Sequence, residues 1–202
     1  MKFRAYRAGF TFSTWRDQQF KPRKTLCASS RRLYLLPLMD ESMIGDSMTN
    51  TFMARAIQLA IDNVRSGQGG PFGAVVVQGN DIVAEGVNQV TANNDPTAHA
   101  EVLAIRHACR KLGVFELKDC ELYTSCEPCP MCLGAIYWTR LARVYYGSFA
   151  ADASQAGFDD SFIYREIALL HAQRGIPMIQ IMRDEALAAF RAWKEKPDRI
   201  HY

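Results

Sequence analysis

The spacing of hydrophobic positions changes along the chain from a helical period to a strand period and back, beginning near residue 50. Apolar residues recur every three or four positions over 52–65 and Gly67 follows, which predicts an amphipathic helix with a stop signal. Two short apolar runs at 74–78 and 82–87 flank a Gly-Asn-Asp turn and predict a β-hairpin. A second helical period covers 98–112 and ends at a glycine. The pattern therefore predicts the order helix, strand, strand, helix.

The alternation of helices and strands continues to the C-terminus. We expect strands at 121–125, 144–147 and 178–182, helices at 128–139, 161–171 and 185–193, and polar loops at 89–97 and 150–157. The predicted fold class is α/β, a three-layer α/β/α sandwich in which helices cover both faces of one mixed five-stranded sheet. The 202 residues hold 49% hydrophobic side chains and no internal repeat or low-complexity linker, so a single core is expected.

Two short motifs carry the candidate chemistry: His99-x-Glu101 and, about thirty residues later, Pro128-Cys129-x-x-Cys132. This combination is the signature of zinc deaminases. One imidazole and two thiolates supply three ligands for Zn²⁺ and leave the fourth position to water, as catalytic zinc sites do. Glu101 is then free to carry protons. Both motifs stand at predicted helix starts, so the positive ends of the two helix dipoles would favour ionisation of the bound water.

Other interpretations of single residues stay open on the sequence alone. Cys126 could close the site as a fourth ligand, although its place before the helix start makes us expect otherwise. Asp160 follows Asp159 at a helix start, where either carboxylate could be an N-cap. Asn88 could satisfy turn backbone at the end of a strand, and Phe72 could be a core or lid aromatic. A functional role for these residues needs more than spacing.

Charge is unevenly distributed along the chain. Residues 1–39 hold nine Lys and Arg and one acid, whereas residues 40–202 hold 15 Lys and Arg and 20 Asp and Glu, a balance of −5. A protein that grips a nucleic acid needs a basic footprint, so we expect a small-molecule partner and no nucleic acid. The sequence has no run of about 18 apolar residues, so no membrane span is expected. Six cysteines without a secreted-scaffold spacing favour the reducing cytoplasm.

The basic segment 1–48 shows no clear helical or strand period. It could be a targeting peptide, a disordered basic tail, or sequence upstream of the true start, with Met39, Met43 or Met48 as the initiator. We favour the third interpretation, because the first predicted helix begins just after Met48 with polar capping residues available. Intact-mass measurement of the native protein tests this expectation, and a mature chain that begins at Met1 would contradict it.

From about residue 50 onward the chain resembles the cytidine deaminase-like superfamily and, within it, the small zinc-dependent guanine deaminases of bacteria. The stretches that carry the resemblance are 69–74, 93–101, 124–132 and 156–164. The first three occur in variants across purine and tRNA adenosine deaminases. The fourth, Ala-Gly-Phe-Asp-Asp-Ser-Phe-Ile-Tyr, is the more specific one. The long N-terminal extension is the departure from the family pattern.

The resemblance implies zinc-dependent hydrolysis of guanine to xanthine and ammonia, in purine catabolism or salvage. Carried over residue by residue, it implies that Zn²⁺ is held by His99, Cys129 and Cys132. It implies that the catalytic carboxylates are Glu101 and Asp160. It implies substrate contacts from Asn88, Phe72, Ala100 and Tyr202. A homodimer with exchanged C-terminal segments is also implied, so that Asp160 and Tyr202 could serve either of two sites.

Two other functions are compatible with the zinc motifs. A tRNA adenosine deaminase is the alternative, but the acidic balance of residues 40–202 and the stretch 157–164 speak against it. A protein that keeps zinc only for structure is the third interpretation, and the intact Glu101 argues against it. Relative activity on guanine and on other amino-heterocycles depends on backbone hydrogen bonds that a sequence does not display.

Overall fold

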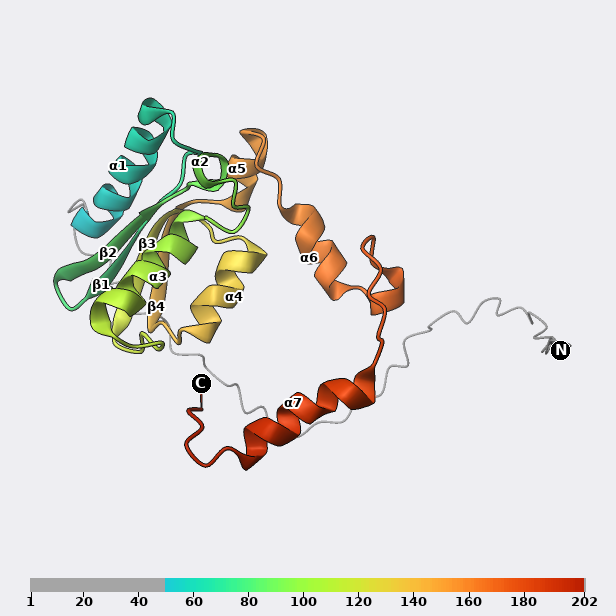
Figure 1. The fold of residues 1–202 in the computed structure, drawn as a ribbon. Helices are drawn as coiled ribbons and strands as arrows, with labels where there is room; N and C mark the ends of the chain where they lie inside the picture. Colours follow the sequence, from blue (N-terminus) through green and yellow to red (C-terminus); the bar gives the residue numbers. More distant parts are fainter. Residues whose placement is uncertain (1–49, 202) are drawn as a thin grey trace, which may run out of the picture. The chain divides into compact units, whose positions relative to one another are not determined.

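The computed structural model describes residues 50–201. Along this range the elements follow in the order α1 (Thr51–Ser66), β1 (Gly73–Gln78), β2 (Asp81–Val87), α2 (Val90–Asn93), α3 (Ala100–Leu112), β3 (Cys120–Cys126), α4 (Pro130–Trp138), β4 (Arg143–Ser148), α5 (Ala150–Gln155), α6 (Ser161–Ala168), the short 3₁₀ helix η2 (His171–Gln173) and α7 (Arg183–Glu195). The expectations for residues 1–48 and for Tyr202 lie outside the described range. The predicted α/β class is confirmed, and Figure 1 shows the strands and helices in sequence colours.

Local signals set the ends of α1. The Asn50 side chain accepts hydrogen bonds from the backbone N–H groups of Phe52 and Met53, which caps the helix at its start. At the other end Gly67 adopts φ 71°, a left-handed conformation that glycine takes without steric cost. The predicted helix and its stop signal are therefore both present.

The sheet has the strand order β2-β1-β3-β4. β1 pairs antiparallel with both β2 and β3, whereas β3 and β4 run parallel, so the sheet is mixed as expected. Ala74 of β1 pairs with Thr124 of β3, which brings the end of the hairpin beside the strand that leads into the cysteine motif. The topology thus places the end of β2 and the end of β3, which leads into the cysteine motif, at the same end of the sheet.

Alternate residues of β1 pack against different helices. Ala74 and Val76 belong to a core cluster with side chains of α3 and α4, whereas Val75 and Val77 pack with side chains of α1. Because successive side chains of a strand point to opposite faces, α1 covers one face of the sheet and α3 with α4 covers the other (Figure 1). This is the predicted three-layer arrangement.

Gly86 of β2 permits the close approach of α3 to the sheet. A Cβ atom at this position would lie 2.2 Å from the carbonyl oxygen of Ala100 and 2.5 Å from the amide nitrogen of Ala104. Any larger residue would push α3 away from β2. The glycine therefore fixes the start of α3, where His99 stands, beside the end of β2, where Asn88 stands.

Four predicted features differ in the structure. The expected fifth strand at 178–182 is not formed, and the sheet described has four strands. An apolar strand segment is stable only beside a partner, and the side chains of Ile179 and Ile181 are 81% and 75% exposed. The loops expected at 89–97 and 150–157 contain the short helices α2 and α5. Pro130, not Pro128, opens α4.

No helix in the described range 50–201 is long and apolar enough to cross a membrane.

Candidate active site

Two helix starts meet at the candidate site. His99 is the N-cap residue of α3 and Cys129 is the N-cap residue of α4, and neither side chain caps its own helix. The imidazole Nδ1 of His99 lies 3.5 Å from Sγ of Cys129 and 3.5 Å from Sγ of Cys132. Both motifs therefore converge, with the positive ends of both helix dipoles directed to one point.

These three side chains fit a tetrahedral zinc ion. In tetrahedral geometry, nitrogen and sulfur ligands at about 2.0 and 2.3 Å from one zinc lie about 3.5 Å apart, which matches the observed nitrogen–sulfur separation of 3.5 Å. Within the described range, His99, Cys129 and Cys132 form the one group whose ligand atoms all lie within 4.8 Å of one another. Cys126 stands outside this group, and its thiol contacts the carbonyl of Phe149 instead. Three protein ligands leave a coordination position open, as a catalytic metal site requires.

The two thiols of the candidate site are strongly coupled. A hydrogen bond from Cys132 lowers the pKa of Cys129 to about 4, and His99 contributes in the same direction. The pKa of Cys132 is raised, because its thiol hydrogen-bonds Cys129 and because it is buried beside negative charges. The protein alone thus prepares one thiolate, and binding of a metal would release the second proton.

Glu101 lies in the first turn of α3 and is almost completely buried, with 5% of its surface exposed. Its Oε1 accepts a hydrogen bond of 3.3 Å from the hydroxyl of Thr124, and its Oε2 accepts one of 3.4 Å from the thiol of Cys132. Burial raises the pKa of the Glu101 carboxyl. A carboxyl group with a raised pKa takes up a proton more readily than a free one, which suits an acid–base catalyst.

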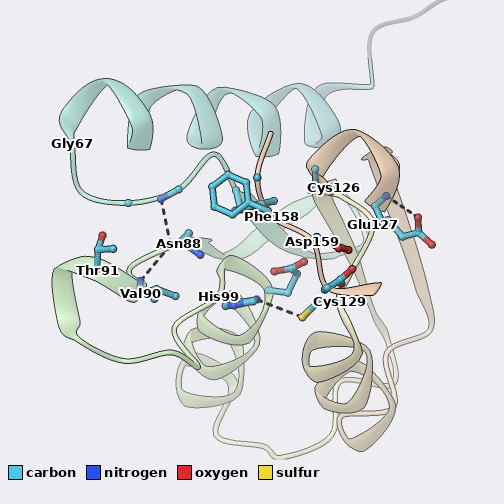
Figure 2. A pocket seen from close by; sticks show the side chains of 18 residues that line it. Gly67, Asn88, Val90, Thr91, His99, Cys126, Glu127, Cys129, Phe158 and Asp159 are labelled. Carbon is cyan, nitrogen blue, oxygen red and sulfur yellow. Dashed lines mark hydrogen bonds between the residues drawn. The ribbon is translucent and has the colours of Figure 1, made fainter. Parts of the chain in front are cut away.

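A cavity of about 540 Å³ opens onto these groups. His99, Glu101 and Cys129 line it, together with Asn88 and Phe158, as the labelled side chains of Figure 2 show for most of them. A cavity of this size is typical of small-molecule sites. Its wall after β4 is held by a hydrogen bond of 3.0 Å from the Ala150 amide to Oε2 of Glu127 (Figure 2).

The structure separates the two neighbouring aspartates at the start of α6. Asp159 accepts a hydrogen bond of 2.9 Å from the backbone N–H of Ser161, so its carboxylate acts at the helix start. Asp160 makes no capping hydrogen bond with its side chain and lines the cavity. Partial burial, followed by the negative charge of Cys129, raises the pKa of the Asp160 carboxyl. Asp160 therefore faces the same space as the metal-ligand group.

The other predicted contact residues are placed differently from one another. Asn88 follows β2, is buried and lines the cavity. Phe72 also lines the cavity and packs edge-on against Phe158, with ring centroids 5.0 Å apart. Ala100 is fully buried in the core cluster between α3 and the sheet, and Tyr202 lies outside the described residues. The structure thus brings Asn88 and Phe72 to the cavity and keeps the Ala100 side chain beneath it.

Comparisons with known proteins agree with this geometry. Residues 46–148 match the cytidine and deoxycytidylate deaminase zinc-binding region. The chain is 56% identical over 152 residues to guanine deaminase from Bacillus subtilis (strain 168), an alignment that covers 75% of this chain and 97% of that protein. The chain belongs to the cytidine and deoxycytidylate deaminase family.

Solved structures and a second group of relatives place the chain within this deaminase family. The X-ray structure of guanine deaminase from Bacillus subtilis matches with a TM-score of 0.74 at 55% identity and covers 76% of this chain and 98% of that one. Guanine deaminase from Nitrosomonas europaea matches with a TM-score of 0.52 at 30% identity, covering 70% and 81%. The tRNA-specific adenosine deaminase of Aquifex aeolicus (strain VF5) is 44% identical over 78 residues, covering 39% and 52%.

Two residues of this deaminase contribute to the site without having been predicted from the sequence. Thr124 supports Glu101 from the neighbouring strand. Asn63 of α1 is buried and donates hydrogen bonds to the carbonyls of Gly70 and Asn88. The signal for Asn63 is its position seven residues after Ala56 on the buried stripe of α1, where an apolar residue would be expected.

Proposed function

We infer that this chain hydrolyses guanine to xanthine and ammonia. The observation that carries this conclusion is the convergence of His99, Cys129, Glu101 and Asp160 on one cavity of about 540 Å³. The metal-ligand group and Glu101 fit hydrolytic deamination in general. Identity of 56% to a guanine deaminase across 97% of its length supports guanine as the substrate.

Zinc is the metal that we propose for His99, Cys129 and Cys132. The mixed nitrogen and sulfur ligands, their separation and the open coordination position suit this ion. When bound, zinc supplies a Lewis acid that lowers the pKa of water toward neutrality.

Glu101 is the residue that we propose as the proton carrier. It accepts a proton from the attacking water and passes it to N3 of guanine while the oxygen atom adds to C2. The second proton goes to the amino group, the bond between C2 and that nitrogen breaks, and ammonia leaves as the C2 carbonyl of xanthine forms. The Thr124 hydroxyl, 3.3 Å from Oε1, holds the carboxyl in place through these transfers.

Asp160 is the second acidic group that we propose at the leaving amine. Its carboxylate lines the cavity without a capping role, and burial together with the charge of Cys129 keeps its pKa above the ordinary value. It can accept a hydrogen bond from the exocyclic amine of guanine and share the proton that departs with ammonia.

The purine contacts that we propose come from the opposite wall of the cavity. Asn88 supplies an amide that can hydrogen-bond the ring, and Phe72 and Phe158 form an aromatic pair beside it. Ala100 and Tyr202 remain predictions from the family resemblance. A contact from Ala100 would have to come from its backbone, because its side chain has no exposed surface.

Ammonia release by the purified, zinc-loaded protein tests the proposed function. The panel contains guanine, guanosine, adenine, cytosine and a tRNA anticodon stem-loop. Selective turnover of guanine is the expected result. Turnover of the stem-loop alone would replace the proposal by the tRNA adenosine deaminase, whose relatives share 44% identity over 78 residues.

We also propose a homodimer, in the reducing cytoplasm, in which the C-terminal segments are exchanged. The segment after residue 160 carries no buried residue in α6, η2 or α7. A groove elsewhere on the chain is lined by apolar side chains of α1, including Ile57, Ile61 and Val64, and by Gly147 of β4. The apolar segment 178–182 of a second copy can add to β4 as a fifth strand and cover this groove.

A further inference from the structure

A closed ring of hydrogen bonds connects α1 to Asn88, which lines the cavity. The side-chain amide nitrogen of Asn63 donates to the carbonyl of Gly70 at 2.9 Å and to the carbonyl of Asn88 at 2.8 Å. The amide of Gly70 in turn donates to Oδ1 of Asn88 at 3.3 Å. Three residues from α1, from the following loop and from the end of β2 are therefore joined in a cycle.

The orientation of the Asn63 amide follows from its partners. Both neighbours, at Gly70 and at Asn88, are carbonyl oxygens, which only accept hydrogen bonds, so the atom that faces them is the nitrogen. Oδ1 of Asn63 is buried and makes no hydrogen bond within the described range. A buried unpaired carbonyl costs free energy, which offsets part of the stability that the two donated bonds supply. The two donated bonds are what it contributes.

The same ring fixes the side chain of Asn88. Its Oδ1 accepts from the amides of Gly70 and Val90, both at 3.3 Å, as the dashed lines of Figure 2 show. With the oxygen held by backbone, the NH₂ group is the part of Asn88 left for the cavity that this residue lines. Asn88 therefore presents hydrogen-bond donors, which suit an acceptor atom of a purine ring.

The loop that contains Gly69 packs so closely against Asn88 at the end of β2 that no residue larger than glycine fits at position 69. A Cβ atom at Gly69 would lie 2.1 Å from the carbonyl oxygen of Asn88 and 3.0 Å from the amide nitrogen of Asn63. The Asn88 carbonyl thus contacts Gly69 on one side and accepts the hydrogen bond from Asn63 of α1 on the other. A shift of the Asn63 side chain would therefore displace Asn88.

We propose that Asn63 is a positioning residue for substrate, which acts through Asn88 by clamping the carbonyls of Gly70 and Asn88. The inference rests on the proposed deaminase function of the cavity. Asn63 itself does not line the cavity. It sets the direction in which the Asn88 amide points, and so contributes to binding of the ring rather than to proton transfer at Glu101.

Steady-state kinetics of Asn63→Leu, a change that keeps the number of side-chain heavy atoms and the branching but removes both donors, tests the proposal. The substrate is the purine that the wild-type enzyme turns over fastest. We expect its KM to rise at least about tenfold, the effect of hydrogen bonds lost from a buried site, while kcat changes less. Asn63→Asp, which has the same shape but sets a carboxylate against two carbonyls, should raise KM in the same way. It serves as the second variant if the leucine variant does not fold.

Thr139→Val is the matched control. Thr139 is also buried and its hydroxyl also hydrogen-bonds carbonyls, those of Ala135 and Ile136, but it does not line the cavity. This variant should lower thermal stability and leave KM unchanged. If Asn63→Leu behaved in the same way, with lower stability and unchanged KM, Asn63 would be purely structural and the proposal would be wrong. The proposal would also be wrong if both Asn63 variants failed to fold while Thr139→Val folded.

A double-mutant cycle tests whether Asn63 acts through Asn88. In an Asn88→Ala background, Asn63→Leu should raise KM little further, because the side chain that it orients is gone. Fully additive effects would overturn the proposed route. Turnover of a different aminopurine in place of guanine, together with the KM shift, would refute the proposed substrate and leave the role of Asn63 supported. Guanine turnover without the KM shift would support guanine as the substrate and refute the role of Asn63.

Discussion

Two regions of the described chain differ in how far their apolar residues are buried. Every buried residue of the described range lies between Ala56 and Thr139, in or beside the sheet and its helices. The region after residue 160 contains α6, η2 and α7, and none of these elements has a buried residue. Yet this second region is not polar, since Ile176, Ile179 and Phe190 are 80%, 81% and 65% exposed.

The difference shows which functions one chain can support alone. The first region buries its own core and assembles the metal-ligand group, Glu101 and the Asn88 wall from its own helices and strands. The second region has an amphipathic sequence whose apolar face has no cover among the described residues. Exposed apolar surface of this extent is typical of an interaction site. The first region therefore holds the metal-ligand group and Glu101, and the region after residue 160 is suited to association.

The largest expected effect comes from the chemistry of the first region. Glu101→Gln keeps the shape and the hydrogen bond from Thr124 but cannot carry a proton. We expect guanine turnover to fall by about 10²- to 10⁴-fold, the usual contribution of acid–base catalysis, while the zinc content stays at one ion per chain. Ammonia release and metal analysis on the same sample measure both quantities. Unchanged turnover would remove Glu101 from the mechanism, and lost zinc would make its role structural.

The second region should respond through association. Ile179→Glu combined with Ile181→Glu places charges on the apolar face of the segment expected to add to a second copy. We expect dimer affinity to fall by at least about a hundredfold, since each buried apolar side chain contributes about 1.5–3 kcal/mol. Sedimentation equilibrium over a range of protein concentrations measures it.

Gln180→Glu is the matched control for this double variant. It adds a charge to the same segment, but in a strand its side chain points to the other face. We therefore expect the control to remain a dimer. A wild-type chain that is monomeric at all concentrations would contradict the exchange, as would equal effects of the control and the double variant.

The comparison also explains what the sequence could predict. The helix at α1, the hairpin of β1 and β2, and the convergence of His99 with the cysteine pair depend on short-range patterns that are satisfied within the first region. The run 178–182 has the same strand pattern, but it pairs with no strand among the described residues. The hydrophobic pattern indicates that a segment can form a strand, but it does not show which strand would pair with it.

Long-range polar contacts were the second kind of feature that sequence could not predict. The bond from Asn63 to Asn88 spans 25 residues, and nothing in the local pattern joins them. Spacing also left Asp159 and Asp160 equivalent at the start of α6. Both line the cavity, but Asp159 accepts a hydrogen bond from the Ser161 amide whereas the Asp160 side chain makes no capping hydrogen bond.

The smallest expected effect is on the stability of the first region alone, because it concerns an ion pair on the surface of that region. Arg55 of α1 donates to both carboxylate oxygens of Glu85 of β2, at 2.7 and 2.8 Å. This pair holds the pKa of Glu85 below its ordinary value of 4.5. Both side chains are partly exposed, at 43% and 34%, so solvent weakens the interaction.

Replacing Arg55 by Gln should lower the free energy of unfolding by about 0.5 kcal/mol at pH 7. Because the pKa of Glu85 is lowered in the folded state, its contribution is present above the unfolded value of 4.5 and is lost as pH falls through the folded value. Denaturant unfolding at pH 7 and at successively lower pH should show a difference that shrinks as the pH falls. Arg65→Gln, whose pair with Asp62 is longer at 3.8 Å, should show none. The Arg55 effect should not depend on protein concentration, unlike that of Ile179 and Ile181, because α1 and β2 belong to one chain. A pH-independent loss would mean that Arg55 contributes through packing of its stem and not through its charge.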